Sequence, residues 1–114
     1  MKLWLDDVRP VPEGYVWCRS VNETKVLIEE FEKLFGSYFL YYPTTGEDYR
    51  VRIELIDIDH DAGDYAQFGG DYIRLLDWLE ETGRNYPIRI HSANPVGVAN
   101  MRRIIQRNGW KEIK

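Results

Sequence analysis

Short apolar runs of strand length alternate along the chain with longer segments in which apolar residues recur every three or four positions. Prolines, glycines and acidic residues separate these segments, as is typical of short strands and amphipathic helices. Strands are expected at 2–5, 15–18, 52–58 and 87–91. Helices are expected at 20–35, 71–82 and 94–108. This alternation predicts an α/β fold with a mostly parallel sheet of four or five strands.

Several residues mark where the helices begin. Ser20 and Glu23 have the spacing of a capping box, in which the Ser20 hydroxyl accepts the Glu23 amide hydrogen. Asp71 is expected to cap the second helix, and Asn94, followed by a proline, the third. The apolar spacing predicts the buried side of the first helix to consist of Val26, Leu27, Phe31, Leu34 and Phe35.

The connections are less regular. Residues Asp6–Gly14 hold two prolines and a glycine, which predicts a loop with little room for a helix. Gly63–Gly70 is expected to be a loop, and Trp110–Ile113 a final strand. The tyrosine-rich run Tyr38–Tyr42 and the segment Tyr49–Ile58 predict either a hairpin or a lengthened edge strand.

Composition limits the class of protein. A chain of 114 residues, of which 44% are hydrophobic, suits a single domain over 1–114 with one core. A single cysteine, Cys18, excludes an internal disulfide bond. We see no signal peptide or membrane-spanning run and therefore expect a cytoplasmic protein that does not associate with a membrane.

Charge is distributed unevenly over a net value of −4. Residues 54–81 carry nine acids and one base, whereas residues 82–114 carry seven bases and one acid. An acidic pocket beside a basic flank suits a metal ion and an anionic substrate, although two solvated helix faces of opposite sign explain the outer residues equally well.

Three polar clusters directly follow predicted strands: Asp6-Asp7, Asp59-His60-Asp61 and His91-Ser92-Ala93-Asn94. Ligands of open α/β sheets bind outside the carboxyl ends of the strands, so we expect these clusters to share one crevice. Carboxylates this close repel one another unless a cation or protons lie between them. The clusters therefore predict a divalent-metal site, with Mg²⁺ or Mn²⁺ as the cation.

Each candidate also has a structural interpretation. Asp6 and Asp7 could simply begin a loop, and His91 could be a metal ligand, an acid–base group or a core histidine. Asp57 needs a partner if it is buried, and the sequence leaves open whether it joins the site or is neutralised in the core. Tyr65 and Phe68 could cover the site or stack on a base.

Three further residues suit the binding of phosphoryl oxygens. Ser92 can donate a hydrogen bond, and Arg9 can bind a phosphate with two, or can neutralise the neighbouring acids instead. Asn94 is more typical of a helix cap than of a catalytic group, but a helix start can bind an anion.

These motifs resemble receiver domains of response regulators, which have an acidic pair after strand one, a phospho-accepting aspartate after strand three and Ser or Thr after strand four. Asp6-Asp7, Asp59 and Ser92 match these positions. The resemblance implies a flavodoxin-like three-layer sandwich in which the first receiver helix is missing. The lysine that follows the fifth strand in that family is also missing.

The motifs Leu5–Pro10, Asp59-His60-Asp61-x-Gly63 and His91–Pro95 resemble more closely the cyclic-phosphate-processing receiver-like family. This resemblance implies a metal-dependent phosphoesterase that acts on the cyclic phosphate of an RNA end or a nucleotide, with RNA-repair or signalling proteins as partners. It implies Asp6, Asp7 and Asp59 as metal ligands, Asp59, His60, Asp61 and His91 as catalytic residues, and Arg9, Ser92 and Asn94 as substrate-binding residues. The alternatives are a phospho-accepting or pseudo-receiver signalling domain, with Asp59 as the acceptor, and a non-catalytic module that binds a nucleotide or a protein.

Overall fold

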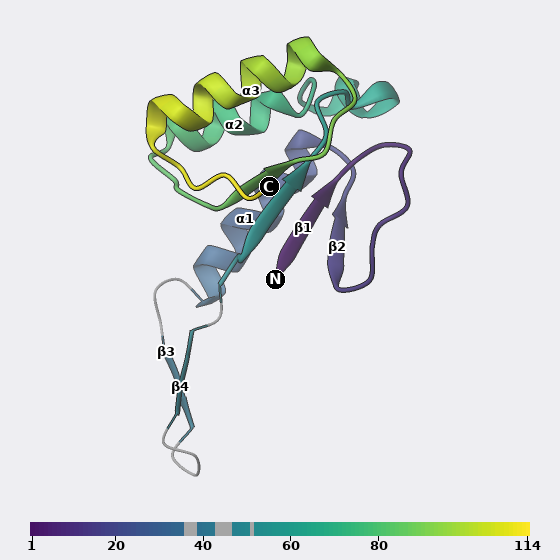
Figure 1. Cartoon of the computed structure of the whole chain (residues 1–114). Coiled ribbons are helices and arrows are strands. Elements are labelled where there is room, and N and C mark those ends of the chain that lie inside the picture. The colour runs from purple at the N-terminus through teal and green to yellow at the C-terminus, as the bar shows by residue number, and fades with distance from the viewer. Residues whose placement is uncertain (36–38, 43–46, 51) are drawn as a thin grey trace.

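A computed structural model describes the backbone of residues 1–35, 39–42, 47–50 and 52–114, and the side chains of residues 1–35 and 52–114 (Figure 1). Its centre is a parallel sheet of four strands in the order β2-β1-β5-β6. The strands are β1 (Lys2–Leu5), β2 (Tyr15–Cys18), β5 (Leu55–Ile58) and β6 (Ile88–Ile90). This confirms the predicted α/β fold and its parallel sheet. The strand expected over 52–58 is shorter than predicted, since it begins at Leu55.

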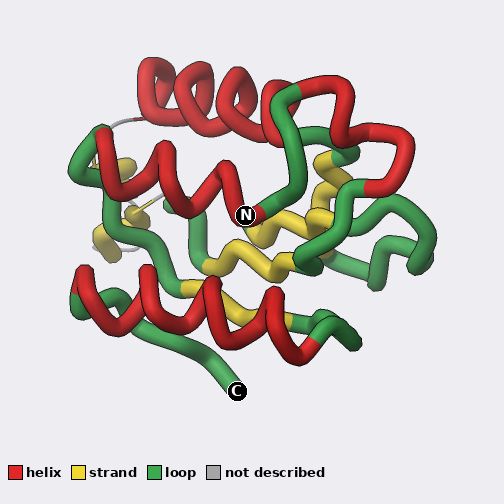
Figure 2. The backbone as a smooth tube through the Cα atoms, turned by 90° about the horizontal axis from the view of Figure 1, so that it is seen from above, coloured by secondary structure: helices red, strands yellow, loops and turns green. Residues whose placement is uncertain are grey.

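All three helices pack on one face of this sheet. From β2 onward each crossover moves in the same direction, to β5, to β6 and then to Glu112, which bridges to Ile88 beyond the β6 edge. Right-handed crossovers in one direction place their helices on the same face. Figure 2 shows the helices (red) side by side in chain order. They are α1 (Val21–Phe35), α2 (Ile73–Glu81) and α3 (Pro95–Asn108).

The core lies between this face and the helices. Side chains alternate along each strand, so Leu3, Leu5, Ile56, Ile58 and Ile88 point to the helices and are fully buried. They pack with apolar side chains of the helices in one continuous cluster. The helix side of that cluster includes Val21, Ile28, Leu75, Leu76, Leu79, Met101, Ile104 and Ile105.

The opposite face of the sheet carries Trp4, Trp17, Asp57 and Arg89. The connection that would cover it, residues 6–14, contains no helix, as predicted from its prolines and glycine. In place of a helical third layer, this loop folds back on the sheet, and the Arg9 carbonyl accepts a hydrogen bond of 3.3 Å from the Trp4 indole. Trp17 nevertheless stays 42% exposed, so this face is only partly covered.

The helix starts follow the sequence in two cases out of three. The Ser20 hydroxyl accepts the Glu23 amide hydrogen at 3.1 Å, and Asn94 Oδ1 accepts the Gly97 amide hydrogen at 3.0 Å. The expected Asp71 cap is wrong, because Tyr72 occupies the cap position of α2. Asp71 Oδ1 instead accepts the amide hydrogen of Ala62, which fixes the loop after β5.

The expected buried side of α1 is partly wrong. Val26 and Leu34 are 62% and 70% exposed, whereas Val21, Thr24 and Ile28 are buried. Residues three and four apart share one side of a helix, and the continuous set here runs from Val21 through Thr24 and Ile28. Thr24 belongs to it because its hydroxyl donates to the Ser20 carbonyl at 2.7 Å and is thereby satisfied inside the core.

Three connections can be compared with the predicted loops and strands. Residues Gly63–Phe68 form a 3₁₀ helix, η1, where a loop was expected. Of the two alternatives for the tyrosine-rich run, the hairpin is found, since β3 (Phe39–Tyr42) pairs antiparallel with β4 (Glu47–Arg50) in a sheet of their own. The second strand begins before the expected Tyr49, and Tyr38 lies outside the described residues. The expected C-terminal strand is reduced to the bridge between Ile88 and Glu112. No helix within the described residues is long and apolar enough to cross a membrane.

Candidate metal centre at the carboxyl edge of the sheet

Three strands that lie next to one another, β1, β5 and β6, end at the same edge of the sheet. The polar clusters that follow them are therefore neighbours, as the sequence predicted. Asp6 and Asp7 leave β1, Asp59 leaves β5, and His91 leaves β6. The Asp59 amide donates to the Leu5 carbonyl at 2.9 Å, which holds the ends of the first two strands in register.

Asp6, Asp7 and Asp59 form an acidic cluster. One carboxylate oxygen of each lies within 4.8 Å of the others. Asp6 is fully buried, Asp59 is 8% exposed, and Asp7 is partly buried. Oxygens at this spacing can share one small cation, directly or through its water molecules.

Asp6 is held in its charged form. Burial of its carboxyl group raises the pKa, but hydrogen bonds from the Arg9 and Val8 amides and from His91 outweigh this and lower the pKa overall. Both amide contacts are 2.9 Å and end on Oδ1. The loop after β1 therefore folds around this carboxylate, which fixes the carboxylate in position.

Asp7 is the opposite case. Burial raises the pKa of its carboxyl group, and repulsion from Asp6, Asp59 and Asp61 adds to the increase against the lowering effect of its own backbone hydrogen bond. The ionised form of Asp7 is therefore disfavoured unless a positive charge offsets the repulsion from the neighbouring carboxylates. A divalent cation supplies that charge, and oxygen-only ligands are what Mg²⁺ and Mn²⁺ prefer. The donor set thus fits a hard divalent cation.

Close backbone approach makes this arrangement possible. A Cβ atom added to Gly63 would lie 2.1 Å from Asp7 Oδ2, and Gly63 has a φ of +54°. The glycine of the Asp59-His60-Asp61-x-Gly63 motif therefore leaves space for the Asp7 carboxylate and permits a turn that other residues rarely adopt.

His60 is paired with Asp61 and packed against α3. Its Nδ1 lies 2.9 Å from Asp61 Oδ1. A Cβ atom added to Gly97 would lie 2.4 Å from His60 Cγ, so the ring rests on the bare backbone of the first turn of α3. The side chain is only 15% exposed. His60 and Asp61, with Asp71, also form a second group whose ligand atoms lie within 4.8 Å of one another.

His91 lies between two buried carboxylates. Its Nδ1 is 2.6 Å from Asp57 Oδ1, and its Nε2 is 2.9 Å from Asp6 Oδ2. The ring stacks on Trp4 with a centroid distance of 3.8 Å and an interplanar angle of 2°. Both ring nitrogens donate to these carboxylates when both carry a proton. In this geometry His91 orients Asp6 and presents no unengaged nitrogen.

Asp57 belongs to this network, a point that the sequence left open. It is 1% exposed, accepts a hydrogen bond of 3.2 Å from the Tyr15 hydroxyl, and lies 3.6 Å from an Arg89 nitrogen. Strand alternation contained the signal, because Asp57 and Arg89 each precede a site residue by two positions and pair in register between β5 and β6.

The three residues expected to bind substrate lie at the rim of the same edge. The Arg9 guanidinium donates to the His91 carbonyl and lies 4.0 Å from Asp6 Oδ2. Ser92 Oγ accepts the Asn94 amide hydrogen at 3.2 Å. Asn94 caps α3, and its Nδ2 lies 3.5 Å from Asp61 Oδ2. Each of these side chains therefore has an intramolecular partner in addition to any role with a ligand.

Comparison with known proteins bears on the fold and the family. No curated protein and no solved structure matches the chain. A family model described as the cyclic-phosphate processing receiver domain matches residues 1–107, which include every residue of the acidic cluster and of the His60 and His91 networks. The chain belongs to the cyclic-phosphate processing receiver domain family.

Proposed function

We propose that this protein is a metal-dependent phosphoesterase that processes a cyclic phosphate, carried by an RNA end or by a nucleotide. The observation that carries the proposal is the acidic cluster of Asp6, Asp7 and Asp59. The family description supports the substrate class. RNA-repair or signalling proteins are the partners that this activity suggests.

In this proposal Asp6, Asp7 and Asp59 hold Mg²⁺ or Mn²⁺. A cation bound there supplies positive charge that polarises a phosphoryl oxygen and stabilises the negative charge that develops on it. The chain prepares this position in advance, since Asp6 is fixed by two amides and His91, and Asp59 Oδ1 by the His60 amide at 2.8 Å.

His60 is the proposed acid–base group. Asp61 accepts a hydrogen bond from Nδ1 and thereby favours the tautomer in which Nε2 is free to take up a proton. His60 would accept the proton of the attacking water at Nε2 and return it to the leaving oxygen. Asp61 holds the ring during both transfers.

His91 holds Asp6 in this scheme. The sequence also suggested a proton-transfer role for His91, which stays a prediction. Its contacts with Asp57 and Asp6 support the positioning role, because a ring bound at both nitrogens is fixed in orientation.

Substrate oxygens would be bound at the rim. The Ser92 hydroxyl can donate a hydrogen bond while it accepts one from the Asn94 amide. Arg9 adds a positive charge, and the start of α3 adds amide hydrogens that favour an anion. Arg9 comes from the loop after β1 and lies 4.0 Å from Asp6, whereas Ser92 and Asn94 come from the connection between β6 and α3.

Thermal unfolding with EDTA and with Mg²⁺ or Mn²⁺ tests the metal site in wild type and in Asp59→Asn. At a cation concentration about 100 times the dissociation constant, binding stabilises the folded wild type by about 2.7 kcal/mol. Asp59→Asn should lose this stabilisation. The control is Asp77→Asn on α2, which removes an acid outside the cluster and should respond to the cation as wild type does.

Turnover of 2′,3′-cyclic nucleotides tests the chemistry. We expect His60→Ala to reduce kcat by about 100-fold, the usual contribution of a general acid–base group. Full turnover in both Asp59→Asn and His60→Ala would contradict the assignment of the site.

A further inference from the structure

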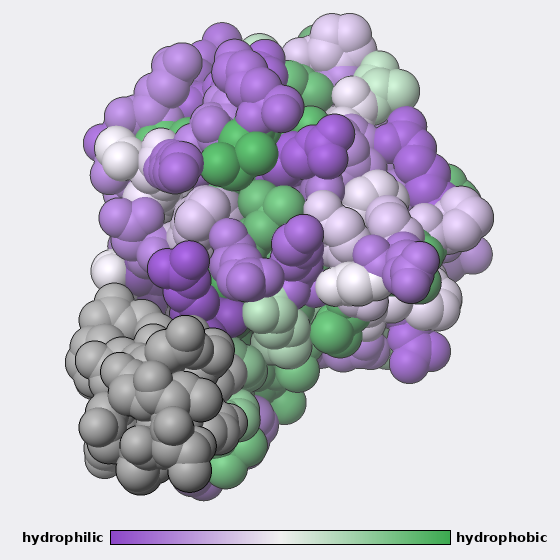
Figure 3. Space-filling view, turned by 60° about the horizontal axis from the view of Figure 1, so that its bottom comes forward, coloured by the Kyte–Doolittle hydropathy of each residue, from purple (hydrophilic) through white to green (hydrophobic). Residues whose placement is uncertain are grey.

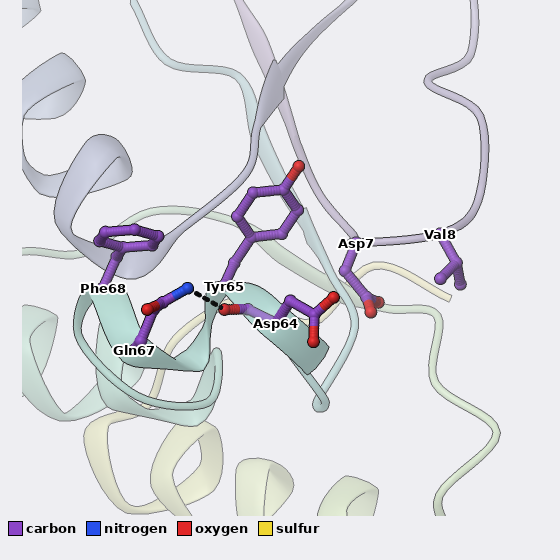
Figure 4. A pocket seen from close by; sticks show the side chains of 6 residues that line it. All are labelled: Asp7, Val8, Asp64, Tyr65, Gln67 and Phe68. Atoms are coloured by element: carbon purple, nitrogen blue, oxygen red, sulfur yellow. Dashed lines mark hydrogen bonds between the residues drawn. The ribbon is translucent and has the colours of Figure 1, made fainter.

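A cavity of about 270 Å³ opens beside the acidic cluster (Figure 4). It is lined by Asp7, Val8, Asp64, Tyr65, Gln67 and Phe68. We call it the aromatic pocket. It shares Asp7 with the acidic cluster, so the pocket is within reach of a ligand whose phosphate binds a cation in the cluster.

Both walls of the aromatic pocket are held by the backbone. On one side, Asp6 Oδ1 accepts the Val8 amide hydrogen and fixes the turn of Asp7 and Val8. On the other side, η1 is closed by a hydrogen bond of 2.7 Å from the Gly70 amide to the Ala66 carbonyl. Gln67 Nε2 donates to the Asp64 carbonyl at 3.1 Å. The pocket is therefore formed before any ligand binds.

Two aromatic rings line the η1 side. Phe68 is 49% exposed, whereas Tyr65 is partly buried and packs against the core. A second hollow of about 290 Å³, which includes Arg19 and Ser20, lies against the same two rings. Tyr65 and Phe68 thus line both hollows, and the exposed ring of Phe68 is suited to stacking on a planar base.

The charge of the residues that line the aromatic pocket limits the kind of ligand that it can bind. The lining residues of the aromatic pocket include two carboxylates, Asp7 and Asp64, and no basic side chain. These two carboxylates repel a phosphate, so the phosphate of a ligand is expected to bind the cation instead. An uncharged heteroaromatic ring with N–H groups is favoured, because it can stack on Phe68 and donate to the Asp64 carboxylate.

We propose that the aromatic pocket binds the nucleobase of the substrate. This rests on the proposed function for the position of the phosphate and narrows the substrate class to nucleotides or RNA ends, as opposed to small cyclic phosphates without a base. Phe68 is the specificity-determining side chain, and it acts by stacking.

Calorimetric titration in Mg²⁺ tests the pocket by binding alone. Guanosine 3′-monophosphate and ribose 5-phosphate are titrated into wild type, Phe68→Ala and Phe68→Trp. Stacking of one base on one ring should give the nucleotide about tenfold tighter binding than the sugar phosphate in wild type. Phe68→Ala should remove this difference and leave ribose phosphate binding unchanged, and Phe68→Trp should restore it.

Leu34→Ala is the matched control, because it removes an apolar side chain that is 70% exposed on α1, outside the pocket. It should bind both ligands as wild type does. Equal affinity of wild type for nucleotide and sugar phosphate, or binding of neither, would overturn the nucleobase pocket. Turnover of 2′,3′-cyclic GMP is measured in parallel. Turnover together with equal affinity for the nucleotide and the sugar phosphate would contradict the pocket but not the proposed function. Binding that depends on Phe68, without turnover, would support the pocket and contradict the proposed function.

Discussion

The Asp7 carboxylate lies against the backbone of Gly63, and this contact couples the local conformation of the chain to the acidic cluster. Gly63 has a φ of +54°, and the Asp7 carboxylate occupies the position that a side chain at residue 63 would need. Gly14 has a φ of +85° but nothing within 4 Å of an added Cβ atom. A side chain at residue 14 would therefore cause backbone strain alone, whereas a side chain at residue 63 would cause backbone strain and also collide with Asp7.

We predict that Gly63→Ala and Gly14→Ala differ in their response to cation. Gly14→Ala should lower the free energy of unfolding by about 1 kcal/mol through backbone strain alone, with no change in metal binding. Gly63→Ala should lower it further and weaken Mg²⁺ binding by about tenfold or more, because Asp7 must move. Urea unfolding and Mg²⁺ titration measure both quantities. Equal metal affinity in the two variants would show that Asp7 is no ligand.

At the scale of residues, the sequence predicts the acids and histidines of the site but not their partners. Asp6, Asp7 and Asp59 could be recognised because each follows a predicted strand. The contacts of His91 with Asp57 and Asp6 depend on the pairing of β1, β5 and β6, which no local pattern states. The same holds for Gly97, whose role is visible only when α3 lies against His60.

At the scale of elements, α1 is tied to the segment that precedes β6. Glu32 on α1 accepts three hydrogen bonds from Arg84, at 2.9 and 3.1 Å from Nε and at 2.8 Å from Nη2, and another from the Tyr86 hydroxyl. Burial raises the pKa of Glu32, but its bonds to Arg84 and Tyr86 lower the pKa overall. The Arg84 guanidinium also lies 4.3 Å from the ring centroid of Trp78 on α2.

We predict that Glu32→Gln lowers the free energy of unfolding by about 1.5 kcal/mol at neutral pH, the usual contribution of hydrogen bonds to a charged group. A lowered pKa in the folded state means that this contribution is fully present above the ordinary value of 4.5 and is lost as pH falls below it. The difference between wild type and variant should therefore disappear in acid. Urea unfolding from pH 7 to pH 3 measures it.

Glu30→Gln is the control on the same helix, since Glu30 is exposed and should leave stability unchanged at every pH. A constant difference between Glu32→Gln and wild type across the pH range would show that shape, not charge, explains the effect.

The element boundaries show what periodicity can and cannot predict. The strands β1 and β2 and the extent of α1 follow from local pattern, because turn and capping residues mark where β1 ends, where β2 begins and where α1 begins and ends. The buried side of α1 was misassigned at Val26 and Leu34, since apolar residues also occur on exposed helix surfaces. Asp71 was misassigned as a cap, because a tertiary contact with Ala62 outweighs the local preference.

At the scale of the whole molecule, one face of the sheet carries the helices and the other carries the polar network of Asp57 and His91. The direction of the crossovers explains this division. The sequence predicted that the segment between β1 and β2 has no helix, but the three-layer sandwich that it also led us to expect is not found, because no helix of the described residues covers the second face. The network is buried by Trp4, Tyr15 and the loop after β1. The face that lacks a helix therefore carries the side chains that hold Asp6 of the acidic cluster in place.

The acidic cluster that is proposed to bind a cation lowers the stability of the folded protein when no cation is bound. The raised pKa of Asp7 means that its charged form is disfavoured by folding, so without a cation the ionised carboxyl group destabilises the protein at neutral pH. We predict that Asp7→Asn, in EDTA, raises stability by about 1 kcal/mol and the thermal midpoint by about 4 °C. Addition of Mg²⁺ should raise the thermal midpoint of the wild type but not that of Asp7→Asn. Asp77→Asn, on α2, is the control, and its thermal midpoint should equal that of the wild type both in EDTA and in Mg²⁺. A lower midpoint for Asp7→Asn in EDTA would mean that the backbone hydrogen bond of Asp7 outweighs the repulsion, and the cluster would then be stable without a cation.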